Sequence, residues 1–302
     1  MRLMTPTMQC PQCRASLGAL AGSVLTCSAC GESYECVDGV WRFLPAARVA
    51  HFERFLADYT AVRMAEGRGS ADPEYYRRLP GPTAGDPLAW QWTMRARTWS
   101  FMARRCVPSW PPDAVVVDLG AGMGWLSNRV AELGCRAVAV DLSVDDRDGL
   151  VATRHLGGSW PRLQAEFDRL PLADATADVV VFNASFHYAV DPAVTMHEAL
   201  RVLRPGGQVV IADSPLYRRD RDGRAMVAER HADFERRFGT RSDSVPSIEY
   251  LTPALLQSLA ASCGVRWRVR RPWYGWHWAL RPWKATWTRC WCMPSVSVGS
   301  RP

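Results

Sequence analysis

The stretch VVVDLGAGMGWLSNRVAEL, residues 115–133, decides the fold of this chain. The valine run predicts a buried strand that ends near Asp118, and WLSNRVAEL has the apolar spacing of a helix. Between them, glycines occupy every second position. Glycine lets the backbone pass close beneath a ligand, and the following helix presents its N-terminus to that ligand. The stretch therefore predicts a strand–loop–helix unit that binds a nucleotide-like molecule.

The spacing of the glycines separates two kinds of ligand. A second strand, CRAVAVDLS, ends in Asp141, where a carboxylate can accept both hydroxyls of a ribose. A dinucleotide fingerprint requires G-x-G-x-x-G, but its third glycine would fall on Trp125 or Ser127. The pattern present is D-x-G-x-G-x-G, with Asp118 ahead of the glycines. A carboxylate there repels a pyrophosphate and attracts an ammonium or sulfonium group, as in S-adenosylmethionine (SAM).

Two segments together resemble the core of class I SAM-dependent methyltransferases. The first is residues 115–143, and the second is EFDRLPLADATADVVVFNASFHYAVDPAVTMHEALRVLRPGGQVVIAD, residues 166–213. The second is most similar to the type-11 group, which includes quinone-biosynthesis enzymes. The glycine loop, the second acid, LPL-D---DVVV and E--RVLRPGG occur in the family's order. The resemblance implies an α/β fold with a Rossmann-like seven-stranded core.

The resemblance also implies which residues hold the methionine part of SAM. They are the carboxylate at the end of the first strand and two loop glycines: Asp118, Gly120 and Gly122; the third glycine, Gly124, is also expected among the cofactor-binding residues. Each of these positions alone is also compatible with plain turn chemistry. The ordered set is what favours SAM.

The same resemblance implies the ribose and adenine contacts. Asp141 would bind the ribose, and Leu142 would pack on the adenine. Glu166 stands where the family usually has an aspartate that bonds the adenine amino group, and Phe167 would flank the ring. Asn183, at the end of the fourth strand, would face the edge of the donor.

Candidate catalytic residues follow the fourth strand. Methyl transfer is an in-line displacement, so alignment and exclusion of water supply much of the catalysis. An oxygen or carbon acceptor can also need a base. NASFHYAVDP places His187 and Tyr188 at the face where acceptors bind in this fold, with His187 as the candidate base. The alternative is that His187 only packs beside the donor.

Two cysteine pairs at the front of the chain predict a metal site. CPQC holds Cys10 and Cys13, and CSAC holds Cys27 and Cys30. Each C-x-x-C turns two thiolates toward one point, and two pairs complete a tetrahedron around Zn²⁺. Disulfides and reduced structural thiols are the alternatives, and a reducing compartment disfavours disulfides. The segment resembles zinc-ribbon modules that precede or partner methyltransferases, which implies a structural zinc.

The remaining segments complete the expected domain organisation. We expect a zinc ribbon at 1–45, a helical linker at 46–112, a methyltransferase domain at 113–290 with an arginine-rich insertion at 214–249, and a disordered tail at 291–302. The linker is either a plain connection or a lid lined by Tyr75, Tyr76, Trp92 and Arg95. The tryptophan-rich stretch at 272–292 is expected to wall an acceptor site, to stack bases or to form a hairpin core.

Charge and composition restrict the partners. The net charge is +7, but residues 113–213 hold 8 basic and 14 acidic residues. All but one of the 37 basic residues are arginine, which is typical of GC-rich coding and not of a dedicated nucleic-acid surface. No apolar run reaches the roughly 20 residues that span a bilayer, and the N-terminus lacks a secretion signal. We therefore expect a cytoplasmic protein without a membrane span.

Three functions remain open at this point. The first is methyl transfer to a small molecule, such as a quinone-like, lipid or secondary-metabolite acceptor. The second is methylation of an RNA base, because a zinc module before this core also resembles enzymes that modify a guanine of large-subunit ribosomal RNA. The third is a non-catalytic partner protein that binds SAM, which an intact donor site disfavours. Composition does not identify the acceptor or the oligomeric state.

Overall fold

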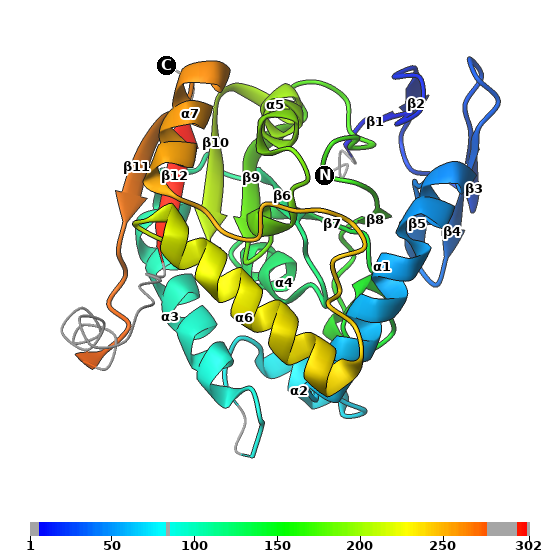
Figure 1. Cartoon of the computed structure of the whole chain (residues 1–302). Coiled ribbons are helices and arrows are strands. Elements are labelled where there is room, and N and C mark those ends of the chain that lie inside the picture. Colours follow the sequence, from blue (N-terminus) through cyan, green and yellow to red (C-terminus); the bar gives the residue numbers. More distant parts are fainter. Residues whose placement is uncertain (1–5, 83–84, 277–294, 301–302) are drawn as a thin grey trace.

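The computed structural model describes residues 6–82, 85–276 and 295–300. Its main sheet has ten strands in the order β11-β12-β10-β9-β6-β7-β8-β5-β4-β3 (Figure 1). Seven of them form the Rossmann-like core: β6 (Val115–Leu119), β7 (Arg136–Asp141), β8 (Arg162–Gln164), β9 (Ala177–Asn183), β10 (Leu203–Ala212), β11 (Arg266–Arg270) and β12 (Val296–Ser300). Strands β6 to β10 pair in parallel, and β12 runs antiparallel to β10 and β11. The expected Rossmann-like seven-stranded core is confirmed.

Helices cover both faces of this core. They are α4 (Trp125–Glu132), α5 (Pro192–Val202) and α7 (Pro253–Cys263), with short 3-10 turns at η1 (Val107–Ser109), η2 (Leu150–Leu156) and η3 (Phe186–Tyr188). Val117 packs with Met196 of α5 on one face of the sheet, and Val116 packs with Leu126 of α4 on the other. Every residue of β6 is buried, which explains its uninterrupted apolar run.

The linker and the insertion supply four further helices. They are α1 (Ala46–Ala65), α2 (Pro73–Arg78), α3 (Ala89–Arg105) and α6 (Asp220–Phe238). Helices α1, α3 and α6 gather near the end of the sheet at which β9 points (Figure 1). In parallel α/β sheets, ligands bind at the carboxyl ends of the strands, so these helices lie where they can cover a bound molecule.

The cysteine-bearing segment is joined to the main sheet. Strands β1 (Met8–Gln9) and β2 (Ser16–Gly18) form a small two-stranded sheet, and β3 (Val24–Thr26), β4 (Ser33–Val37) and β5 (Val40–Arg42) follow it. The β4–β5 hairpin turns at Asp38 and Gly39, both with positive φ. Strand β5 then pairs in parallel with β8, so these three strands extend the seven-stranded core to ten.

The expected disordered tail was wrong for residues 296–300. They form β12, which lies between β10 and β11 and pairs with both along its whole length. A five-residue strand of Val, Ser and Gly carries little local signal, and its stability comes from partners far away in the sequence. Residues 277–294, with most of the tryptophan-rich stretch, lie outside the described residues. None of the helices in the described ranges is both long and apolar enough to cross a membrane.

Candidate active site

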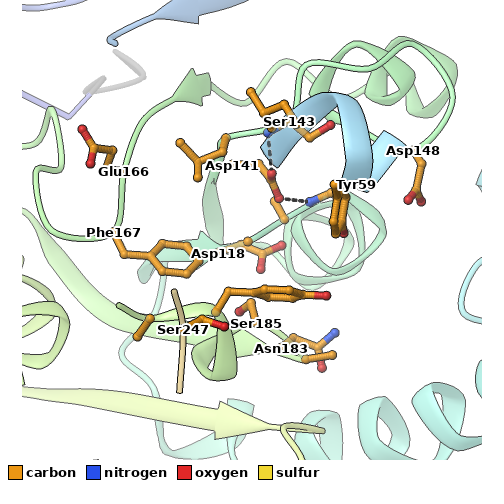
Figure 2. Close-up of a pocket in the computed structure, with 18 of the residues that line it drawn as sticks. Tyr59, Asp118, Asp141, Ser143, Asp148, Glu166, Phe167, Asn183, Ser185 and Ser247 are labelled. Atoms are coloured by element: carbon orange, nitrogen blue, oxygen red, sulfur yellow. Dashed lines mark hydrogen bonds between the residues drawn. The ribbon is translucent and has the colours of Figure 1, made fainter. Parts of the chain in front are cut away.

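A cavity lies where the parallel strands end. It encloses about 1240 Å³ of space free of atoms, part of which is open to solvent. Its walls come from the loops after β6, β7, β8 and β9, from α1 and α3, and from the segment around Ser247. Figure 2 shows Asp118, Asp141, Phe167 and Tyr59 arranged around this space. The cavity therefore coincides with the donor site expected from the sequence.

The loop glycines serve different purposes. At Gly120, with a φ of +78°, an added Cβ would lie 2.3 Å from the Cβ of Ser185. At Gly124, an added Cβ would meet Thr153 and Trp160, and Gly124 does not line the cavity. Only Gly122 has room on its Cβ side, with nothing nearer than 3.6 Å. Two of the three glycines are thus required by packing between loops, and Gly124 is not placed against a ligand.

Asp118 presents an unused acceptor at the cavity. Its Oδ2 accepts hydrogen bonds from the backbone N–H of Ser127 at 3.1 Å and from the Ser127 hydroxyl at 2.8 Å. Its Oδ1 is buried and has no hydrogen-bond partner within the described part of the chain. Burial raises the pKa of Asp118 to about 7, and the charge of Asp141 adds to the shift. A cationic ligand group would satisfy Oδ1 and stabilise the ionised form.

Asp141 is oriented by the backbone. Its Oδ2 accepts from the N–H of Gly122 and its Oδ1 from the N–H of Ser143, each at 2.7 Å. A carboxylate has about four acceptor sites, so two remain for the hydroxyls of a ribose. Burial raises the pKa of this carboxyl, although both N–H donors oppose the shift. Leu142 lines the cavity next to it.

Glu166 is engaged by an arginine from α1. Nε of Arg48 donates to Oε1 of Glu166 at 2.7 Å, and Nη2 of Arg48 donates to Oε2. The family-based expectation placed Glu166 on the adenine, and that role stays a prediction because its main partner here is Arg48. Phe167 lines the cavity and packs edge-on against Phe182, with ring centroids 5.5 Å apart.

Of the site residues expected at the end of β9 and directly after it, only some line the cavity. Asn183 and Tyr188 line it, and the Tyr188 ring meets that of Tyr59 edge-on at 6.0 Å. His187 is 8% exposed, does not line the cavity, and has Nδ1 3.5 Å from the hydroxyl of Ser214. Burial lowers the pKa of His187 to about 3. The structure therefore does not bring the candidate base to the place where an acceptor would lie.

Helix α1 supplies cavity residues that sequence reasoning missed. They are Phe52, Phe55, Leu56, Tyr59 and Arg63. Their spacing of three and four residues is an ordinary amphipathic signal, which we interpreted as a linker. Covering a ligand site and packing on a core require the same spacing, so only the structure distinguishes them.

Two of the four residues named for a possible lid line the cavity, and the lid itself stays a prediction. Trp92 and Arg95 of α3 line the cavity, whereas Tyr75 and Tyr76 do not. Tyr76 is buried and donates its hydroxyl hydrogen to backbone carbonyls. Helix α3 thus contributes to the cavity wall, while Tyr75 packs edge-on against Trp92 and Tyr76 stacks on His155.

Two arginines bring positive charge to this cavity. Arg63 forms an ion pair with Asp148. The Arg95 guanidinium lies over the ring of Trp92, 4.8 Å from its centroid, and makes no ion pair with any residue in the described ranges. Burial lowers the pKa of Arg95 to about 10, so it stays cationic at neutral pH. The nearby carboxylates of Asp213 and Asp148 oppose this shift without forming an ion pair with Arg95, so this wall can accept a further anionic group.

The four expected metal ligands come together. The Sγ atoms of Cys10, Cys13, Cys27 and Cys30 all lie within 4.8 Å of one another. Backbone N–H groups, that of Cys30 first, lower the pKa of Cys27 to about 7 and so favour its thiolate. Four sulfur donors converging on one point fit a tetrahedral Zn²⁺ and leave no open position for catalysis. The donor set is compatible with a structural zinc.

The chain is similar to known proteins in sequence and in fold. Residues 117–211 match a family model described as a methyltransferase domain. The uncharacterized methyltransferase Rv3342 of Mycobacterium tuberculosis is 38% identical over 112 residues, which are 34% of this chain and 44% of the relative. The demethylmenaquinone methyltransferase of Corynebacterium urealyticum is 35% identical over 117 residues, 39% and 48% of the two chains. The dimethylglycine N-methyltransferase of Parasynechococcus marenigrum is 36% identical over 107 residues, 34% and 38%.

The chain spans less than half the length of each of these relatives. Among solved structures, the YcgJ protein of Bacillus subtilis aligns with a TM-score of 0.49 at 13% identity, over 69% of this chain and 99% of that one.

Proposed function

We propose that this chain, which carries a class I SAM-dependent methyltransferase domain at residues 117–211, binds SAM at the strand ends and methylates a small molecule. The observation that carries the proposal is Oδ1 of Asp118, a buried acceptor without a partner in the described ranges, on the wall of a cavity shared with Asp141. A cationic nucleoside satisfies both carboxylates, whereas a pyrophosphate satisfies neither.

The residues around the cavity have distinct roles in this proposal. Asp118 faces the ammonium group of the donor, Asp141 its ribose and Phe167 its adenine. Arg95 supplies the counter-ion for the donor carboxylate. When bound, SAM supplies an electrophilic methyl group, whose transfer to an acceptor lone pair breaks the S–C bond and leaves S-adenosylhomocysteine (SAH). Helix α1 and Trp92 exclude water and hold the two reactants in line.

Two observations support a small-molecule acceptor. The acceptor side is walled mainly by apolar and aromatic groups: Phe52, Phe55, Leu56, Tyr59, Tyr188 and Val245. Such a lining is typical of small-molecule sites. Two relatives are also named for small acceptors, demethylmenaquinone and dimethylglycine. No residue with the reach and the pKa of a base is assigned, so alignment is the main catalytic device in this proposal.

Labelled SAM tests the proposed function. We expect label to move from SAM into a small-molecule extract and not into total RNA or protein. Label in RNA, with binding that weakens steeply as salt rises, would establish the RNA alternative instead. Label in no fraction, together with measurable SAH binding, would indicate a non-catalytic SAM-binding protein. Asp141→Ala should weaken SAH binding by more than about tenfold, since it removes both ribose contacts. Unchanged binding would refute the donor site.

A further inference from the structure

The loop after β8 is held from outside by the cysteine-bearing segment. This loop, residues 166–172, contributes Glu166, Phe167 and Asp168 to the cavity wall. On its other side lie residues 7–14, which include the first cysteine pair. The contacts between these two segments link a metal site to a ligand site.

Backbone pairing attaches the N-terminal segment before and after the loop. Ahead of it, β5 pairs with β8, and the N–H of Phe43 donates to the carbonyl of Gln164 at 2.9 Å. At its far end, the N–H of Gln9 donates to the carbonyl of Pro171 at 3.2 Å. The N–H of Ala173 donates to the carbonyl of Thr7 at 3.0 Å. The loop therefore starts and ends on backbone that the cysteine-bearing segment pairs with.

A side-chain relay adds a third attachment. Arg14 follows Cys13 directly, and its N–H donates to the carbonyl of Cys10 at 2.8 Å, so the cysteine turn orients it. Its guanidinium binds Glu198 through two hydrogen bonds of 2.7 and 3.1 Å. Oε1 of Glu198 also accepts from the N–H of Leu170 at 2.7 Å. The relay thus runs from the cysteine turn to the backbone of the loop.

Charge keeps the relay in place. Glu198 is 7% exposed on its side chain and also binds Arg201 of the same helix. Burial alone would raise the pKa of Glu198, but hydrogen bonds from Arg201 and Arg14 outweigh it and lower the pKa below its usual value. Glu198 therefore stays ionised, and a charged acceptor makes a stronger hydrogen bond to the N–H of Leu170 than a neutral one.

We infer that the cysteine cluster is a clamp on the donor-binding loop and that Arg14 is a positioning residue for the adenine side of the site. A metal held by the cysteines fixes the turn that carries Arg14, and Arg14 through Glu198 fixes Leu170. A loop ordered before binding costs the ligand less entropy. Metal and donor then bind cooperatively, each raising the affinity of the other by the same factor. The inference rests on the proposed function, because it takes the ligand to be SAM or SAH.

Arg14→Gln tests the clamp against a matched control, Arg204→Gln. Arg14 is 39% exposed and Arg204 is 41% exposed, and each makes a paired contact to one carboxylate. Asp178, the partner of Arg204, binds the N–H of Val115 at the start of β6, away from the cavity. We expect Arg14→Gln to raise the Kd for SAH about fivefold to tenfold by calorimetry, the range of a modest coupling. Arg204→Gln should leave this Kd unchanged, and Arg14→Lys should restore part of the affinity.

Two further measurements separate a positioning effect from general destabilisation. In the ligand-free protein, hydrogen exchange should accelerate at residues 166–174 in Arg14→Gln and not in Arg204→Gln. The affinity for 5′-methylthioadenosine, which has the adenine and ribose but no amino-acid part, should fall by the same factor as that for SAH. In chelator-treated protein, added Zn²⁺ should lower the Kd for SAH.

The outcomes distinguish this inference from the proposed function. If wild-type protein binds SAH and Arg14→Gln binds it equally well with unchanged exchange at 166–174, the clamp is refuted and the donor site stands. If wild-type protein binds no SAH, the proposed function fails, and the exchange measurement alone decides whether Arg14 orders the loop.

Discussion

Arg48 and Glu166 tie helix α1 to the loop after β8 across the cavity, with Nε of Arg48 2.7 Å from Oε1 of Glu166. The two residues are 118 positions apart, and the Glu166 side chain is only 11% exposed. Because Phe52, Tyr59 and other α1 residues line the cavity, this ion pair fixes α1 to the opposite wall, which the loop after β8 forms. We expect movement of α1 to control the release of a bound donor.

Breaking this pair should speed release of the donor. We expect Arg48→Gln to raise the dissociation rate of SAH about tenfold, since a two-bond contact to a mostly buried carboxylate contributes roughly 1.4 kcal/mol. Stopped-flow fluorescence would measure the rate. Arg54→Gln, which alters an 83% exposed arginine on the same helix, is the control and should have no effect. Equal rates in both variants would show that α1 does not gate the donor.

The pKa of Asp118, raised to about 7 by burial, predicts a pH-dependent donor affinity. A cationic ammonium requires the ionised carboxylate, which forms as the pH rises through 7. The affinity for SAH should therefore rise about tenfold from pH 6 to pH 8 and then level off. Asp118→Asn should bind SAH weakly, with a flat profile over that range. The same slope in both proteins would assign the titration to another group.

Arg95 should matter only for ligands that carry a carboxylate. Arg95→Gln is expected to weaken SAH binding about tenfold and to leave 5′-methylthioadenosine unaffected, because the latter has no carboxylate. Calorimetry with both ligands makes the comparison within one protein. Arg104→Gln, at an exposed position of the same helix, is the control. Loss of affinity for both ligands would show that Arg95 supports the site by packing on Trp92 instead.

His187 should affect stability in acid and not the pH dependence of turnover. Its pKa is lowered from 6.5 to about 3 by burial, so the unfolded chain takes up a proton below pH 6.5 that the folded chain does not. The free energy of unfolding should fall as the pH drops from 6.5 toward 3, by up to about 1.4 kcal/mol per pH unit from this group. His187→Asn should show a shallower fall in denaturant titrations. A lost limb in the pH–rate profile of His187→Asn would restore His187 as a base.

The cysteine cluster should bind about one Zn²⁺ per chain, because four thiolates complete its coordination. Cys27→Ser is expected to lose the metal by elemental analysis and to lower the midpoint of thermal unfolding. Cys36→Ser is the control, since Cys36 lies in β4 and is not part of the cluster. Full metal content in Cys27→Ser would refute the four-sulfur site.

Local signals account for what could be predicted from the sequence. The run from Val115 to the α4 helix carries a strand, a glycine turn and an amphipathic helix within about 20 residues, and Asp141 ends β7 while Asp118 is the last residue but one of β6. The cysteine pairs likewise specify their own convergence, because each C-x-x-C turn is local. These parts needed no information from distant residues.

Other features were missed because their partners are far away in the sequence. Strand β12 pairs with β10, which lies some 90 residues earlier in the chain. A run of five Val, Ser and Gly residues does not by itself predict a strand. The Arg14–Glu198 contact spans 184 positions. His187 has the residue type and the strand-end position of a base, but it is buried beside Ser214 and does not line the cavity.

By itself, the sequence determined the parallel α/β core and the cysteine cluster, and Asp118 with the glycines is the source of the SAM prediction. The signal for each of these lies in residues close together in the chain, through their backbone preferences and side-chain chemistry, although the sheet itself forms between distant strands. Only the tertiary structure decided that α1 lines the cavity, that Arg95 forms no ion pair within the described ranges, and that the cysteine segment joins the sheet at β8. Those features arise from packing between segments far apart in the chain, such as β5 and β8, for which a linear pattern contains no signal.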